Sequence, residues 1–87
     1  MPTELTGEDL LDYYREAVRA EYGSGVADRC MLQCENGWYH QKLPILNGRV
    51  DAKGACMSGY TNESVAYRAG EFREMADGLL KRAKEEL

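Results

Sequence analysis

The sequence predicts an α+β domain in which two helices pack on one face of a three-stranded antiparallel meander, in the order α-β-β-β-α. Apolar residues repeat at helical spacing near both ends of the 87-residue chain and alternate with polar residues in the middle. Two Asn-Gly pairs divide that alternating part. The length fits a single compact domain, residues 1–87, and an apolar content of 44% is too high for a disordered chain.

The first helix is expected to begin after Thr6, with Asp9 in the place of the glutamate of a capping box. Gly23 to Gly25 should end it, because glycine adopts the left-handed conformation at helix C-termini. Its apolar face carries Leu10, Leu11, Tyr14, Ala17, Val18 and Tyr22. Its charged face carries Glu8, Asp9, Asp12, Arg15, Glu16 and Arg19.

From Val26 the pattern alternates, and Asn36-Gly37 predicts a two-residue hairpin turn because both turn positions need positive φ. This turn sets the register, from Glu35 opposite Trp38 down to Cys30 opposite Leu43. One face of the hairpin then collects Cys30, Leu32, Cys34, Tyr39 and Leu43. The other face collects Arg29, Met31, Gln33, Trp38, His40 and Lys42.

Asn47-Gly48 predicts a second hairpin, which would add the third strand. Pro44 lies between the two hairpins and has no N–H for a ladder hydrogen bond, so a bulge or a local break is expected there. The segment from Ala55 to Met57 is a candidate extension of the third strand.

The last helix is expected to start at Thr61 or Asn62. Its apolar stripe consists of Val65, Ala69, Phe72, Ala76, Leu79, Ala83 and Leu87. A helix of about 25 residues is roughly 37 Å long, which exceeds what so small a sheet covers. Either the first helix packs beside it, or the stripe forms a homodimer in which its alanines permit close approach.

Cys30, Cys34, Cys56 and His40 are nominally a zinc ligand set. On a strand, however, Cys30 and Cys34 would lie roughly 13 Å apart, too far to share one ion. Cys34 and His40 fall on opposite faces of the hairpin, which excludes a Cys–His dyad in this register. We therefore expect buried reduced thiols, no metal, no cofactor and no enzymatic activity. The alternative is a small enzyme or metal-binding domain that uses His40 and a cysteine.

The net charge of -4 is unevenly distributed. Residues 1–28 hold seven acids and two bases, whereas residues 29–62 hold two acids and four bases. An acidic first helix suits a protein partner with a basic surface, and the chain lacks the basic excess that direct nucleic-acid binding requires. The exposed tryptophan face of the hairpin is a second candidate surface. The predicted protein-binding residues are Glu8, Asp9, Asp12, Glu16, Met31, Trp38, His40 and Lys42.

No secretory signal and no membrane-spanning run are recognisable, and three cysteines indicate reduced thiols in a cytoplasm. The stretch from Tyr67 to Ala76 resembles helices of small phage or mobile-element proteins. The size, the acidic charge and the mixed α/β order are similar to those of some phage-encoded inhibitors, including anti-CRISPR proteins. This resemblance of build implies a non-catalytic inhibitor of a nucleic-acid-handling protein complex. A structural homo-oligomer assembled through the last helix is the alternative.

Overall fold

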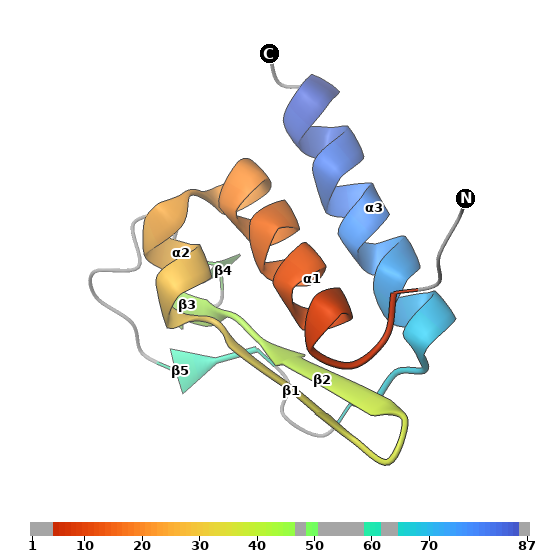
Figure 1. The fold of residues 1–87 in the computed structure, drawn as a ribbon. Coiled ribbons are helices and arrows are strands. Elements are labelled where there is room, and N and C mark those ends of the chain that lie inside the picture. The colour runs from red at the N-terminus through yellow and green to blue at the C-terminus, as the bar shows by residue number, and fades with distance from the viewer. Residues whose placement is uncertain (1–4, 47–48, 51–58, 62–64, 86–87) are drawn as a thin grey trace.

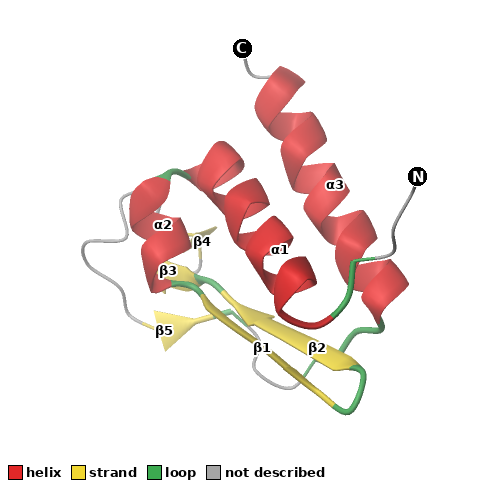
Figure 2. Ribbon diagram, viewed as in Figure 1, coloured by secondary structure: helices red, strands yellow, loops and turns green. Residues whose placement is uncertain are grey.

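The α+β class is confirmed, with the two long helices on one face of a β-hairpin. The computed structural model describes residues 5–46, 49–50, 59–61 and 65–85. The helices are α1 (Gly7–Tyr22), α2 (Ser24–Arg29) and α3 (Ala69–Glu85). The strands are β1 (Met31–Glu35), β2 (Trp38–Lys42), β3 (Pro44–Leu46), β4 (Arg49–Val50) and β5 (Gly59–Tyr60). α1 and α3 lie side by side and run in the same direction, while α2 and the short strands gather at the open end of the hairpin (Figures 1 and 2).

The first helix has the predicted length, but its start is held differently. Thr6 is extended and its side chain makes no capping hydrogen bond, so the capping-box prediction is wrong. The N–H of Gly7 donates instead to the Tyr39 hydroxyl oxygen, at 2.7 Å. Gly7 has φ +58°, the left-handed region that glycine tolerates best, and the chain turns into the helix there. Gly23 ends α1 as predicted, with φ +99° and its N–H bonded to the Arg19 carbonyl.

The segment after Gly23 is a helix and not the beginning of the first strand. Val26 and Ala27 are both buried, although a strand would place neighbouring side chains on opposite faces. Arg15 of α1 donates from Nη1 to the Ala27 carbonyl at 2.7 Å, which satisfies one carbonyl near the end of α2. Cys30 is therefore the C-cap residue of α2 and no member of a strand. Arg29, predicted on the outer face of the sheet, is an exposed residue of α2.

The first hairpin has the predicted turn and register. Asn36 and Gly37 have φ of +52° and +80°, and the ladder runs from Glu35–Trp38 to Met31–Lys42. Cys30 and Leu43 are both buried but lie beyond the ladder.

The continuous three-stranded meander is replaced by two small sheets in the described residues, β1-β2 and β4-β3-β5. The interruption falls at Leu43, beside Pro44, as predicted for a proline between two hairpins. β3 and β4 pair antiparallel, although the Asn47-Gly48 turn itself lies outside the described residues. β5, which was not predicted, pairs with the other edge of β3. The candidate strand extension from Ala55 to Met57 also lies outside the described residues.

The last helix is shorter than predicted. It begins at Ala69, so neither Thr61 nor Asn62 caps it and Val65 lies outside it. Tyr67 is instead bridged to Tyr39 of β2 by two backbone hydrogen bonds of 2.7 and 2.8 Å. The 17 residues of α3 span about 26 Å. α1 packs along α3, which removes the size argument for a homodimer; the homodimer itself remains a prediction.

Phe72 of α3 lies at the centre of the core and is fully buried. Its ring stacks on Tyr14 of α1 at a centroid distance of 4.2 Å and on Tyr39 of β2 at 5.3 Å. Tyr67 contacts the same ring at 6.3 Å. One side chain therefore joins both helices and the hairpin. The other buried core residues are Leu10, Ala17, Val18, Val26, Ala27, Cys30, Leu43, Ala76 and Leu79.

Replacing Gly37 by alanine is expected to destabilise the fold by about 1–2 kcal/mol, because an L-residue at φ +80° is strained. The added Cβ would also lie 3.3 Å from the flexible end of Arg68. Chemical denaturation followed by circular dichroism would measure this loss. Gly78→Ala is the matched control: it makes the same chemical change in the middle of α3, where nothing lies within 4 Å, and should stabilise by up to about 1 kcal/mol. Equal effects of the two substitutions would contradict the turn assignment.

Candidate protein-binding surfaces

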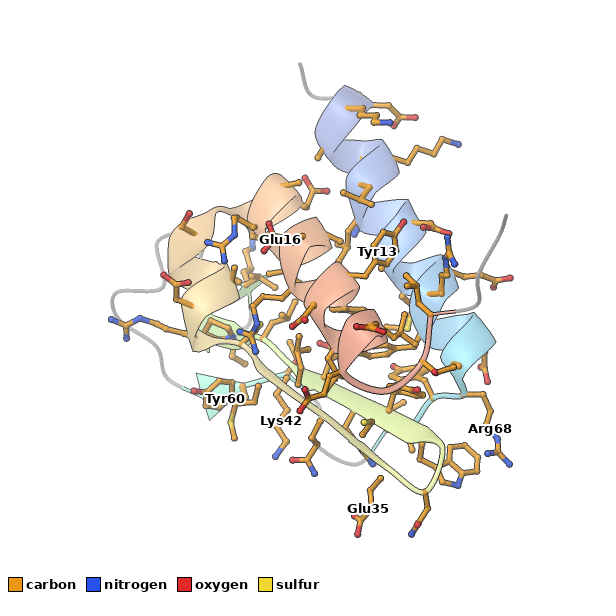
Figure 3. All side chains as sticks on the ribbon, in the orientation of Figure 1. Tyr13, Glu16, Glu35, Lys42, Tyr60 and Arg68 are labelled. Carbon is orange, nitrogen blue, oxygen red and sulfur yellow. The ribbon has the colours of Figure 1, made fainter. Side chains whose placement is uncertain are left out.

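The outer face of α1 is a row of exposed carboxylates. Glu8, Asp9, Asp12 and Glu16 are all exposed, and Figure 3 shows Glu16 pointing away from α3 and the hairpin. Glu16 pairs with Arg19 at 3.3 Å, and Arg19 is also 3.6 Å from Asp28. Among the described residues no cationic side chain pairs with the first three carboxylates. We name this row of four residues the acidic face.

On the flank of α1 that meets α3, the acidic side chains have hydrogen-bond or ion-pair partners on the neighbouring helix. The Tyr13 hydroxyl donates to Asp77 of α3, and this hydrogen bond raises the pKa of Tyr13. The guanidinium of Arg73 lies 5.3 Å from the centre of the Tyr13 ring. Farther along, Arg82 donates to Glu21 at 2.9 Å, and the Glu21 side chain is only 5% exposed. The unmatched negative charge of α1 is therefore concentrated on its outer side.

Two contacts fix where the acidic face lies relative to the hairpin. At the start of α1, Gly7 is bonded to Tyr39, whose partner across the ladder is Cys34. Two turns farther along α1, the guanidinium of Arg15 donates to the Sγ atom of Cys30 at 3.5 Å. α1 therefore runs along β1 in the opposite direction, from the level of Cys34 to the level of Cys30.

The outer face of the hairpin is the second candidate surface. Met31 is 47% exposed and Trp38 is 41% exposed, while His40 and Lys42 are half-buried. The guanidinium of Arg68 lies 4.1 Å from the centre of the Trp38 ring and covers part of it. The sequence did not indicate this contact, because Arg68 was predicted inside the last helix and instead directly precedes α3.

A shallow depression of about 320 Å³ opens beside Trp38, lined by Glu35, Asn36, Trp38, His40 and Ala66. A second hollow, of about 530 Å³, lies at the start of α3, and Leu5, Arg68, Arg73 and Asp77 are among its lining residues. Both are lined by polar or charged side chains as well as apolar ones. Neither brings a nucleophile and a base together.

The predicted contact residues fall into two groups rather than one patch. Glu8, Asp9, Asp12 and Glu16 lie on α1, on the helix side of the hairpin. Met31, Trp38, His40 and Lys42 share the outer side of the hairpin by their register. Because the helices and this outer face are on opposite sides of the sheet, a single flat partner surface cannot cover both.

The cysteines occupy packing positions in the described part of the chain. Cys30 is buried, its thiol donates to the Ala27 carbonyl at 3.1 Å, and burial raises its pKa. Cys34 is half-buried on the inner face of β1, opposite in orientation to His40. Cys56 lies outside the described residues. Within residues 5–46, 49–50, 59–61 and 65–85 no three His, Cys, Asp or Glu side chains are grouped closely enough to hold a metal ion.

None of the helices in the described segments is both long and apolar enough to cross a membrane. Comparison with known proteins finds no significant similarity to a family model, to a curated protein or to a solved structure. Function must therefore be inferred from the two surfaces themselves.

Proposed function

We propose that this chain is a small non-catalytic protein-binding module whose acidic face engages a basic surface of a protein partner. The observation that carries the proposal is the set of exposed carboxylates Glu8, Asp9 and Asp12, which have no cationic partner among the described residues, whereas Glu21 and Asp77 at the seam with α3 are matched. Clustered charge of one sign accelerates association with a complementary surface and selects against like-charged partners.

The most specific form of the proposal concerns a nucleic-acid-handling complex in the cytoplasm. A row of carboxylates along a helix offers negative charge to lysine and arginine side chains that otherwise hold phosphates. By occupying those cations, the acidic face would compete with the nucleic acid and inhibit the complex. The similarity in build to phage-encoded inhibitors supports this reading. The chain itself would not bind nucleic acid.

Reversing two charges of the acidic face, Asp12→Lys with Glu16→Lys, is expected to abolish partner binding and leave the fold intact, since both side chains are exposed. The measurement is affinity capture from the native host's lysate, followed by titration of the captured partner at several salt concentrations. The affinity for the native chain should fall steeply with salt. Thermal unfolding of the variant confirms that it is folded.

The matched control is Glu71→Lys with Glu74→Lys, which changes the net charge equally at exposed positions of α3. It should bind the partner far better than the acidic-face variant. A third variant, Trp38→Ala, tests the outer face of the hairpin. If Trp38→Ala abolished binding while Asp12→Lys with Glu16→Lys did not, the acidic face would be the wrong surface.

A further inference from the structure

The β1 strand has one open edge. Its residues pair with β2 on one side, and among the described residues no backbone group bonds to its other side. An open strand edge presents unpaired N–H and C=O groups, which favour the addition of another extended segment.

The register identifies which groups face outward. In a two-residue hairpin the residues that flank the turn, Glu35 and Trp38, exchange backbone hydrogen bonds, and every second pair after them does the same. The N–H and C=O groups of Leu32 and Cys34 must therefore point away from β2. The other strand obeys the same rule, since Tyr39, opposite Cys34, directs its N–H and C=O to Tyr67. Tyr67 thus occupies the β2 edge at Tyr39, whereas the β1 edge at Leu32 and Cys34 has no such partner in the described chain.

The helix that carries the acidic face packs along this strand. α1 runs along β1 between the contacts of Gly7 with Tyr39 and of Arg15 with Cys30. Between those contacts the exposed residues of α1 include Glu8 and Asp12. A strand added beside β1 would direct alternate side chains to the helix side of the sheet, toward these carboxylates.

From this placement we propose that the open edge of β1 receives an extended, lysine- or arginine-rich segment of the partner as an antiparallel strand. This inference rests on the proposed function and specifies how the basic partner is held. Backbone hydrogen bonds to Leu32 and Cys34 would align the segment, and its basic side chains, at every second position, would meet the acidic face. The remaining side chains would extend the outer face of the hairpin beside Met31.

A second copy of this chain is the less suitable occupant of the edge. Pairing two β1 edges would bring together the acidic faces of two molecules that each carry a formal charge of -4. Like charges at such close range oppose association, whereas a basic segment is attracted to the same place.

The test uses a nine-residue synthetic peptide that alternates lysine and threonine, together with the full chain. In an antiparallel pairing, peptide residues whose side chains face the helices also direct their amides to β1. Methylating the lysine amide nitrogens should therefore weaken binding at least about tenfold, while methylating the threonine amide nitrogens should leave the affinity nearly unchanged. A peptide with glutamine in place of lysine controls for charge.

Amide hydrogen exchange gives an independent readout. Bound peptide should slow exchange at Leu32 and Cys34 much more than at Gln33, whose N–H is already engaged with β2. Equal affinities of the two methylated peptides, with no selective protection, would overturn the added strand and leave the charge-based function standing. Failure of the unmodified peptide to bind would count against the strand and the basic partner together. A doubling of the chain's mass without peptide would assign the edge to a second copy and also overturn the inference.

Discussion

Replacing Phe72 by alanine should lower the free energy of unfolding by about 3–5 kcal/mol, the range typical of large-to-small substitutions of a buried aromatic residue. The side chain is fully buried and touches all three parts of the core through Tyr14, Tyr39 and Tyr67. Its removal would open a cavity between rings that cannot close over it without moving a helix. The stacking contribution of the aromatic pairs would be lost as well.

Urea denaturation followed by far-UV circular dichroism measures this loss. Trp38→Ala is a suitable comparison, because it also removes an aromatic ring but from an exposed position on the outer face. The comparison variant should lose no more than about 1 kcal/mol, the scale of the cation–π contact with Arg68. Similar losses in the two variants would show that Phe72 is not the centre of the core. Because an 87-residue domain has a small total stability, the Phe72 variant should be largely unfolded at elevated temperature.

The first hairpin could be predicted residue by residue because its determinants are local. Asn36 and Gly37 tolerate the positive φ that the turn requires, and the turn length then sets every pair in the ladder. The inward position of Tyr39 and the outward position of Trp38 followed from that register. The outer face of the hairpin, which carries four of the eight candidate contact residues, could therefore be predicted without knowledge of the rest of the fold.

The misassigned elements depend on contacts between distant residues. α2 is a short helix whose Ala27 carbonyl is bonded by Arg15, and no pattern within Ser24–Arg29 indicates that bond. The start of α3 is delayed because Tyr67 pairs with Tyr39, 28 positions earlier in the chain. The apolar spacing of a helix extends back to Val65 in the sequence. The backbone bridge of Tyr67 to Tyr39 and its ring contact with Phe72 nevertheless hold this segment outside α3. Tertiary pairing overrides a local helical preference when the preference is only a few tenths of a kcal/mol per residue.

The same tertiary pairing accounts for the asymmetry of the hairpin. Tyr67 bonds to the β2 edge and so leaves the β1 edge as the side where another strand can be added. α1 lies over the same strand, and its acidic face is exposed. Two features are proposed to recognise a partner, the acidic face of α1 and the open edge of β1. The acidic face alone indicates only a basic partner, and the open edge alone indicates only an extended segment.

The chain should lose stability in alkaline solution because two buried acids hold their protons more tightly when folded. Burial raises the pKa of the Tyr14 phenol, and burial likewise raises the pKa of the Cys30 thiol. In the unfolded chain these groups ionise near their ordinary values, about 10 for tyrosine and about 8.5 for cysteine. Above those values the unfolded state binds fewer protons than the folded state, so the free energy of unfolding falls as pH rises.

Each of the two groups should contribute a decline of up to about 1.4 kcal/mol per pH unit, starting near pH 8.5 for Cys30 and near pH 10 for Tyr14. The stabilising effect is complete below the unfolded pKa and is lost as pH rises through the folded pKa. Urea denaturation at pH 8, 9.5 and 10.5 measures the decline. Tyr14→Phe keeps the ring that stacks on Phe72 but removes the ionisable hydroxyl, so its decline above pH 10 should be shallower. A decline identical to that of the native chain would show that Tyr14 holds its proton no more tightly in the folded state than in the unfolded one.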